Sequence, residues 1–200
     1  MRLDGMSSDN PDTRHRILDT TWALLEAADP ARPVRMADVA RAAGISRQAV
    51  YLHFPNRAEL LSAVTRHVDT VKDVDGRLAA SRAAATGRDR LAAFVAAWGN
   101  YIPEIQGIAR ALQAMRDSDA EARAAWDDRM EAVRQGCAAA VSALARDGDL
   151  RPGLDEATAT DLLCALLTVE TWRHLRQGCG WDQDAYVEAM QRLCAAAVTG

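Results

Sequence analysis

Aromatic residues are scarce in this chain of 200 residues, which has five Trp, three Tyr and two Phe. β-Branched residues are also sparse, whereas alanine makes up roughly a fifth of the sequence. Alanine loses no side-chain entropy in a helix, so this composition favours helix over strand and argues against a mostly-β architecture. Together with the apolar periodicity, it predicts an all-α fold of about nine helices.

Long hydrophobic runs are absent as well, and none reaches the roughly eighteen apolar residues that a transmembrane helix needs. The N-terminal segment is polar and acidic and lacks the apolar core of a signal peptide. We therefore expect no membrane association and a cytoplasmic location. The sequence is compatible with translation from Met1 or from Met6.

The four cysteines, Cys137, Cys164, Cys179 and Cys194, include no CxxC pair. We interpret them as small core residues of a protein in a reducing compartment, with a metal or redox site as the alternative. The sequence also lacks HExxH, GxSxG and a Gly-rich phosphate loop, and its four histidines are scattered. These absences predict a protein that is not an enzyme and has neither a cofactor nor a metal site.

The formal net charge of −4 is unevenly distributed along the chain. Residues 1–72 carry ten Lys and Arg against nine Asp and Glu, whereas residues 73–200 carry fourteen against nineteen. An acidic chain does not bind polyanions through bulk charge. Any contact with nucleic acid therefore depends on where individual basic side chains lie.

Apolar spacing and helix-ending residues predict helices at 12–28, 36–43, 46–54, 56–71, 91–102, 104–116, 119–146, 155–177 and 183–198. Asp12 or Thr13 is the expected N-cap of the first helix, and Pro30 and Pro33 break the chain after it. Pro103 is expected to end another helix.

The polar, Ala-rich passage 72–88 is the expected boundary between two parts of the chain. We predict an N-terminal domain at 10–72, including a linker helix that Asn56 caps, and a C-terminal domain at 73–200.

The segment 35–61, RMADVARAAGISRQAVYLHFPNRAELL, carries the most specific pattern. Its apolar residues have the spacing of two short helices, and Gly44 between them suits a left-handed turn position. Ser46 is a good N-cap for the second helix, whose Val50 and Phe54 are expected to face inward. Such a helix-turn-helix inserts the N-terminal residues of its second helix into the DNA major groove.

The run AxxAGISRxxVYxHFPNRxxLL in this segment resembles the DNA-binding head of the tetracycline-repressor (TetR) family of bacterial regulators. The resemblance implies a three-helix DNA-binding head followed by a helical domain that binds a small molecule and pairs two subunits. It also implies that Tyr51, His53 and Arg57 contact phosphate groups of DNA.

Arg47 and Gln48, at the front of the second helix, have the chemistry to read the edges of guanine and adenine. Arg35 occupies a position where the family usually has a threonine that caps the helix; arginine cannot cap but can contact phosphate. Surface or packing roles are the alternative for each of these residues. The predicted DNA-binding set is Arg35, Ser46, Arg47, Gln48, Tyr51, His53 and Arg57.

The C-terminal part has features of its own that fit the resemblance. The helix expected at 155–177 has an apolar arc wide enough for two neighbours, and the helix at 183–198 carries small residues that permit close approach. We predict a homodimer through these two helices, with two recognition helices about one DNA turn, or ~34 Å, apart on a palindromic operator.

A pocket for an apolar effector is expected in this part of the chain, with apolar walls and one or two polar anchors. Its candidate lining residues are Trp98, Tyr101, Met115, Trp126, Met130, Glu170 and Trp172. The alternative role is a surface ion pair for Glu170 and core packing for the others. The sequence thus predicts a ligand-responsive repressor. The other hypothesis is an all-helical ligand-binding or dimeric interaction protein that does not use its helix-turn-helix on DNA.

Overall fold

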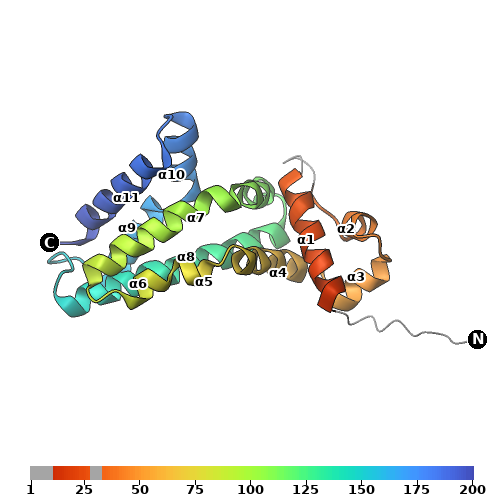
Figure 1. The fold of residues 1–200 in the computed structure, drawn as a ribbon, viewed down its shortest axis with the longest axis horizontal. Coiled ribbons are helices and arrows are strands. Elements are labelled where there is room, and N and C mark those ends of the chain that lie inside the picture. The colour runs from red at the N-terminus through yellow and green to blue at the C-terminus, as the bar shows by residue number, and fades with distance from the viewer. Residues whose placement is uncertain (1–10, 28–32) are drawn as a thin grey trace, which may run out of the picture. The chain divides into compact units, whose positions relative to one another are not determined.

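The computed structural model describes residues 11–27 and 33–200, and Figure 1 shows their arrangement into helices. The predicted all-α fold is confirmed: within the described residues there is no strand beyond an isolated bridge between Leu150 and Thr199. None of the described helices is long and apolar enough to cross a bilayer. The predictions for Met1 or Met6 as start and for a break at Pro30 lie outside the described residues.

The chain divides into two compact units. The first comprises the described residues up to Val71 together with Gly107–Asp128, and the second comprises Lys72–Gln106 and Arg129–Gly200. The first change of unit, between Val71 and Lys72, lies beside the boundary expected from the sequence. Residues 107–128, which we expected in the C-terminal part, belong to the first unit.

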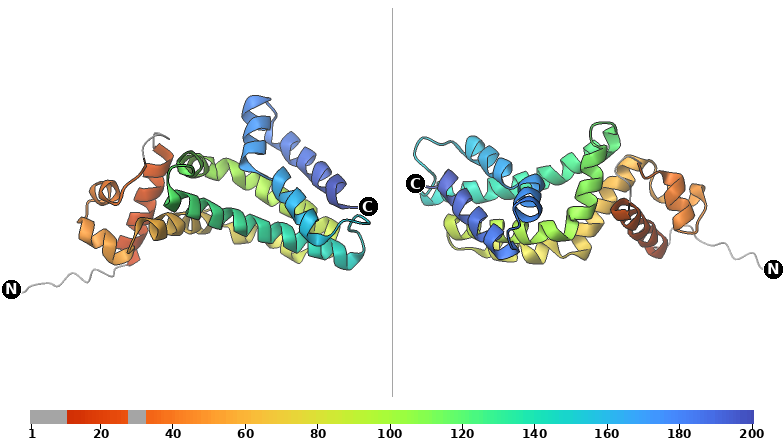
Figure 2. Two further views of the ribbon diagram at one scale, coloured as in Figure 1. Left: turned by 180° about the vertical axis from the view of Figure 1, so that it is seen from behind. Right: turned by 90° about the horizontal axis from the view of Figure 1, so that it is seen from above.

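The first unit begins with four helices: α1 (Pro11–Ala27), α2 (Met36–Ala42), α3 (Arg47–His53) and α4 (Arg57–Val71). Helix α1 packs against both α2 and α4 (Figure 2), and its buried residues are Ile17, Leu18, Thr21 and Leu25. The cap predicted for α1 is wrong, because the helix already begins at Pro11 and Asp12 and Thr13 lie in its first turn. Proline suits this position, where its fixed φ is helical and no N–H is needed.

The remaining helices are α5 (Val74–Arg77), α6 (Ala79–Ala83), α7 (Gly87–Met115), α8 (Ala120–Asp147), α9 (Glu156–Leu166), α10 (Val169–Arg173), the π-helical η1 (His174–Gly178) and α11 (Gln183–Val198). Helices α9 and α11 pack together in the second unit. The passage 72–88, expected as the boundary between two parts of the chain, contains α5, α6 and the first residues of α7. Asp73 begins α5 by accepting a hydrogen bond from the backbone N–H of Gly76.

The prediction that Pro103 ends a helix is wrong, because α7 runs through it without a break. A proline inside a helix leaves the carbonyl four residues earlier without its backbone donor. That carbonyl belongs to Gly99, and the side-chain amide of Gln183 in α11 donates to it at 2.9 Å. A contact from a distant part of the sequence thus satisfies the group that Pro103 leaves open.

The single helix predicted at 155–177 is also wrong, because α9 ends at Leu166 and α10 begins at Val169. Thr168 caps α10, accepting a hydrogen bond from the N–H of Thr171 at 3.1 Å. The carbonyl of Leu167 at the break accepts one from Trp98 Nε1 at 2.7 Å. The break is therefore stabilised on both sides.

Candidate nucleic-acid interface

The turn between α2 and α3 has the geometry that its sequence predicts. Gly44 adopts a φ of +66°, a left-handed conformation in which a β-carbon is strained. The N–H of the next residue, Ile45, turns back to the carbonyl of Ala40 at 3.0 Å and closes the end of α2. This turn sets the direction in which α3 leaves.

Helix α3 is anchored at its start by Ser46 and along one side by two apolar residues. Ser46 Oγ accepts a hydrogen bond from the N–H of Ala49 at 3.1 Å, which confirms the predicted N-cap. Val50 is fully buried and Phe54 is 2% exposed, and the guanidinium of Arg14 lies 4.9 Å from the Phe54 ring centroid. With its inner face fixed in this way, α3 presents its opposite face to solvent.

The exposed face of α3 carries the residues that the sequence proposed for base contacts. Ser46, Arg47 and Gln48 are exposed at its N-terminal end, as a helix entering a major groove requires. Tyr51, one turn further on, is 37% exposed, and Leu52 is 61% exposed. We call these five residues the α3 face.

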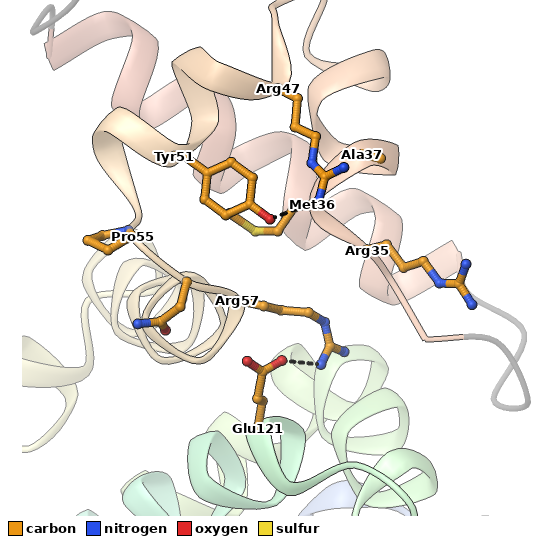
Figure 3. Close-up of a pocket in the computed structure, with 9 residues that line it drawn as sticks. Arg35, Met36, Ala37, Arg47, Tyr51, Pro55, Arg57 and Glu121 are labelled. Carbon is orange, nitrogen blue, oxygen red and sulfur yellow. Dashed lines mark hydrogen bonds and ion pairs between the residues drawn. The ribbon is translucent and has the colours of Figure 1, made fainter.

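Arg47 and Tyr51 contact each other on this face (Figure 3). Arg47 Nη2 donates to the Tyr51 hydroxyl at 3.2 Å, and the Arg47 guanidinium lies 5.4 Å from the Tyr51 ring centroid. A cation over an exposed aromatic ring is worth about 0.5–1 kcal/mol. In the absence of DNA the Arg47 side chain therefore lies along α3, with its charge held beside Tyr51.

Asn56 caps α4, as predicted from the sequence. Its side-chain carbonyl accepts the N–H of Glu59 at 2.9 Å, and its amide donates to the Glu59 carboxylate at 2.9 Å. This reciprocal pair fixes the first turn of α4, and with it the backbone that carries Arg57.

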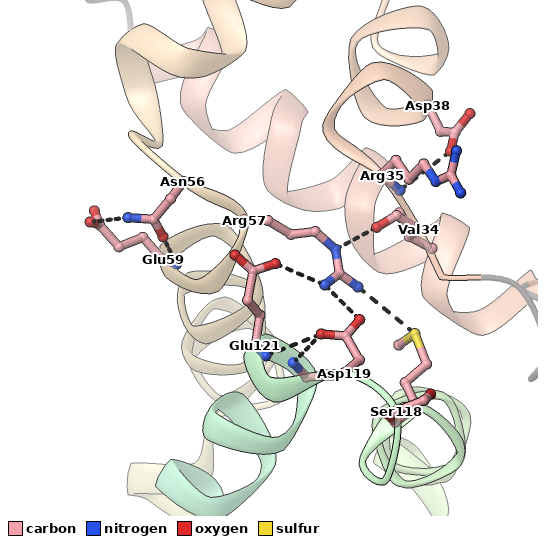
Figure 4. A network of polar contacts seen from close by, with 11 residues as sticks. Val34, Arg35, Asp38, Asn56, Arg57, Glu59, Ser118, Asp119 and Glu121 are labelled. Carbon is pink, nitrogen blue, oxygen red and sulfur yellow. Dashed lines mark hydrogen bonds and ion pairs between the residues drawn. The ribbon is translucent and has the colours of Figure 1, made fainter.

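Arg57 makes four contacts within the first unit (Figure 4). Its Nε donates to the carbonyl of Val34 at 2.6 Å, and its Nη1 lies 2.7 Å from Asp119 Oδ2 and 3.0 Å from Glu121 Oε2. Its Nη2 lies 3.9 Å from the sulfur of Met115. These contacts join the segment before α2 and the turn between α7 and α8 to the start of α4.

The exposure expected of Arg57 is therefore not found, since only 14% of its side chain is accessible. A phosphate would have to compete with two carboxylates that already lie within 3.0 Å of the guanidinium. Sequence analysis missed Asp119 and Glu121 because they lie far along the chain, where no local pattern connects them to Arg57. The only available signal was a run of acidic residues at the start of the helix expected at 119–146.

Arg35 is exposed at the start of α2, where its own side chain makes no capping hydrogen bond. The carboxylate of Asp38 instead reaches back to the Arg35 backbone N–H at 3.3 Å, and Asp38 also pairs with Arg41. The Asp38 carboxylate thus satisfies the Arg35 N–H, whereas a threonine cap would accept an N–H of the first helical turn.

His53, at the end of α3, is less accessible than a phosphate-binding residue is expected to be. Its ring is half-buried, and Nε2 is enclosed with no hydrogen-bond partner among the described residues. A phosphate contact through Nε2 would require the ring to turn outward.

An open hollow of about 560 Å³ lies between the α3 face and the paired Arg57 and Glu121 (Figure 3). Three arginines and one glutamate are among its lining residues. The full lining is Arg35, Met36, Ala37, Arg47, Tyr51, Pro55, Asn56, Arg57 and Glu121. The exposed positive charge at its rim comes from Arg35 and Arg47, because Arg57 is paired with acids. The hollow and the α3 face together form a surface with groups suited to DNA phosphates and base edges.

The structure divides the candidate ligand-binding residues between the two units. Trp98, Tyr101, Met130 and Trp172 belong to the second unit, and Met115 and Trp126 belong to the first. The three candidate tryptophans, Tyr101 and Met115 are buried, Met130 is half-buried, and Glu170 is exposed. The indoles of Trp98 and Trp172 donate to Leu167 and Gln183, so their polar atoms are already used.

One buried residue that the sequence did not single out is Tyr186, whose hydroxyl has no hydrogen-bond partner among the described residues.

Residues 17–64 match the family described as bacterial regulatory proteins, tetR family. No curated protein matches the sequence. The matched residues include α2, α3, the turn between them and the first half of α4, which contribute most of the surface described above.

Solved structures share the fold over nearly the whole chain. A transcriptional regulator from Saccharomonospora viridis in complex with choline is 20% identical, with a TM-score of 0.72 over 96% of this chain and 100% of that one. FadR from Bacillus subtilis in complex with stearoyl-CoA is 16% identical, with a TM-score of 0.73 over 92% and 98%. NalD from Pseudomonas aeruginosa, a repressor of a multidrug efflux pump, is 23% identical, with a TM-score of 0.66 over 96% and 98%. By their names, the first two are transcriptional regulators and the third is a repressor.

Proposed function

We propose that this chain, whose residues 17–64 belong to the TetR family of bacterial regulatory proteins, is a DNA-binding transcriptional repressor that a small molecule releases from its operator. The observation that carries the proposal is the exposure of Arg47 and Gln48 on a helix that Ser46 caps and Val50 anchors. Both side chains stand at the end of α3 that enters a major groove in this type of domain.

In the proposed complex, base readout comes from Arg47 and Gln48. An arginine can bind O6 and N7 of guanine with two hydrogen bonds, and a glutamine can bind N6 and N7 of adenine. Arg47 has to leave Tyr51 to do so, which frees the Tyr51 hydroxyl for a phosphate. Ser46 and Arg35 are placed at the edge of this surface for further contacts to the DNA backbone.

We propose a different role for Arg57 from the one that the resemblance implied. Its carboxylate partners and its low exposure favour a positioning residue that fixes the start of α4, directly after α3. Arg57 then acts on DNA binding through the geometry of the head rather than through a phosphate.

The proposed dimer is built through α9 and α11. Leu162 on α9 is 40% exposed and Leu193 on α11 is 50% exposed, and the two helices pack together. Exposed leucines on adjacent helices are the kind of surface that a second copy covers. A two-fold dimer presents two α3 helices to successive major grooves, about 34 Å apart, and so predicts a palindromic operator.

The proposed effector is a small molecule with a large apolar part, bound in the second unit. FadR and the S. viridis regulator were solved with stearoyl-CoA and choline, so related folds hold ligands of different chemistry. In this chain Trp98, Tyr101 and Trp172 are the large side chains that could form apolar walls, and the Tyr186 hydroxyl is a buried polar group available as an anchor. Such a ligand releases DNA only if it binds more tightly to a dimer state in which the two DNA-binding heads do not have the spacing of the operator. The difference between its affinities for the two states limits the effect.

The experiment that tests the proposal is selection of bound duplexes from a random DNA pool, using the purified protein at moderate salt. An enriched palindrome with half-sites about one helical turn apart supports the dimeric regulator. Binding should also weaken steeply with salt, because phosphate contacts release counterions. No enrichment by a folded, dimeric protein would overturn the proposal and favour the helical protein that does not bind DNA.

A further inference from the structure

Leu52 on α3 is the most exposed of the large apolar side chains among the described residues. It is 61% exposed, whereas Val50 and Phe54, two residues away on either side, are buried in the first unit. A single exposed leucine needs no explanation on an ordinary surface. This one lies on the face of the helix that is proposed to enter a major groove, so its partner there has to be identified.

Leu52 shares its side of α3 with Gln48. Residues four apart on an α-helix project from nearly the same side, one turn from each other. Gln48 precedes the buried Val50 by two residues and Leu52 follows it by two, so each projects about 160° away from Val50 around the helix axis. Both side chains are exposed and point almost directly away from the core.

Beyond the cap Ser46, the α3 face therefore consists of two neighbouring pairs. Arg47 and Tyr51 form the first pair, joined by a hydrogen bond of 3.2 Å. Gln48 and Leu52 form the second. Arg47, Tyr51 and Gln48 all carry groups that can bond phosphates or base edges, whereas a leucine side chain carries none. A partner of Leu52 has to offer an apolar surface.

The major groove of DNA offers one apolar group, the 5-methyl group of thymine. The other features of its base edges are hydrogen-bond donors and acceptors. Against those atoms a leucine would displace water without replacing its hydrogen bonds, which is unfavourable. Against the methyl group two apolar surfaces leave water together, which is favourable.

We propose that Leu52 is a specificity-determining residue that contacts the 5-methyl group of a thymine in the operator. This inference rests on the proposed function, because that function places α3 in a major groove. Gln48 has the chemistry to bind an adenine, and the thymine paired with an adenine displays its methyl group in the same groove. Leu52 lies about 6 Å further along α3, and successive base pairs are about 3.4 Å apart. The thymine should therefore lie within two base pairs of the adenine proposed for Gln48.

The experiment uses the full-length protein and the duplex that selection from the random pool enriches, with its thymines replaced one at a time by deoxyuridine. This replacement removes the methyl group and keeps every hydrogen bond of the base pair. At one thymine of each half-site the native protein should bind about fourfold more weakly, as expected for the burial of one methyl group. In Leu52→Ala the same replacement should make little difference. In Leu52→Met, which keeps an apolar side chain of similar volume, most of the effect should return.

Val71→Ala is the matched control, because Val71 is an apolar residue that is 54% exposed at the opposite end of α4 from Arg57. This variant should keep the full effect of deoxyuridine. If the enriched duplex binds but no thymine shows an effect that depends on Leu52, only the inference about Leu52 is overturned. Absence of any enriched duplex would overturn the proposed function as well.

Two further measurements on Leu52→Ala separate base contact from other roles of this side chain. Circular dichroism and sedimentation should find the variant folded and in the same oligomeric state as the native chain, since Leu52 is exposed and alanine favours a helix. Loss of the fold or of the dimer would assign Leu52 to packing or to a protein interface and overturn the inference. An equal loss of affinity for all duplexes, with and without deoxyuridine, would also contradict it.

Discussion

Arg57 Nη1 lies 2.7 Å from Asp119 Oδ2, and only 14% and 15% of the two side chains are exposed. The pair joins the start of α4 to the residue that precedes α8, at a site where the family resemblance implied a contact with DNA phosphate. Because so little of either side chain is exposed, we expect the pair to stabilise the first unit. The effect of replacing Arg57 should therefore differ from the effect of replacing a residue of the α3 face.

We predict that Arg57→Ala lowers the free energy of unfolding by about 3 kcal/mol, because Asp119 is left buried without its partner. Chemical denaturation followed by circular dichroism measures this loss. The matched control is Arg66→Ala, since Arg66 is 66% exposed and pairs with Asp128 at 3.2 Å, so its loss should cost less than about 1 kcal/mol. If Arg57→Ala were as stable as the control but lowered the salt dependence of DNA binding, Arg57 would be a phosphate contact.

Arg47→Ala should have the opposite profile, with little effect on unfolding and a clear effect on sequence preference. Loss of two hydrogen bonds to a guanine should weaken binding to the selected operator by about 1–3 kcal/mol and relax the preference at one base pair. Repeating the duplex selection with the variant and titrating single-base changes measures both effects. A uniform loss of affinity for unrelated duplexes would assign Arg47 to the phosphates instead.

The oligomeric state should depend on Leu162 and Leu193. Replacing both by aspartate places charge on the surface proposed to bury them, so the variant should sediment as a monomer at concentrations where the native chain is a dimer. Both side chains are exposed within one chain, so the helical content should not change. Leu52→Asp on α3 is the control, because Leu52 is 61% exposed and lies on the surface proposed for DNA. Unchanged dimerisation of the double variant would place the interface elsewhere.

A pH-dependent contribution to stability should come from Glu104. Its Oε1 lies 2.5 Å from Arg77 Nη2, and its Oε2 lies 3.2 Å from Lys72 Nζ. Partial burial opposes its ionisation, but the hydrogen bonds and positive charge of Lys72 and Arg77 outweigh this and lower the pKa of the carboxyl. A lowered folded-state pKa stabilises the fold above the unfolded value, and the contribution disappears as the pH falls through the folded value.

Thermal unfolding between neutral pH and about pH 3 tests this, because Glu104→Gln removes the titrating group. The difference in Tm between native protein and variant should be largest at neutral pH and should shrink in acid. Glu188→Gln is the control, since Glu188 makes an exposed pair with Arg192 at 3.8 Å. A difference in Tm that does not change with pH would show that Glu104 acts through packing alone.

Sequence reasoning was most successful where a structure is set by residues close together in the chain. The turn at Gly44 and the caps at Ser46 and Asn56 depend on neighbours within a few residues, and each was predicted from residue type and spacing. Arg47 and Gln48 are exposed for a similar local reason, because the buried Val50 fixes which face of α3 is turned inward.

The errors arose where a distant residue decides the local structure. Pro103 reads as a helix end because nothing near it in sequence shows that Gln183 will bond to Gly99. The break after Leu166 depends in part on Trp98, and the burial of Arg57 depends on Asp119 and Glu121. Such contacts exist only once the chain has folded, so a pattern read along the sequence does not contain them.

The bond from Gln183 to the carbonyl of Gly99 also orders events during synthesis. A nascent chain releases α7 from the ribosome well before α11, so until Gln183 emerges this carbonyl has neither the backbone N–H that Pro103 lacks nor the amide that replaces it. The middle of α7 is therefore completed by a residue made much later. A ribosome stalled before α11 would therefore hold a chain in which the Gly99 carbonyl has only water as a partner.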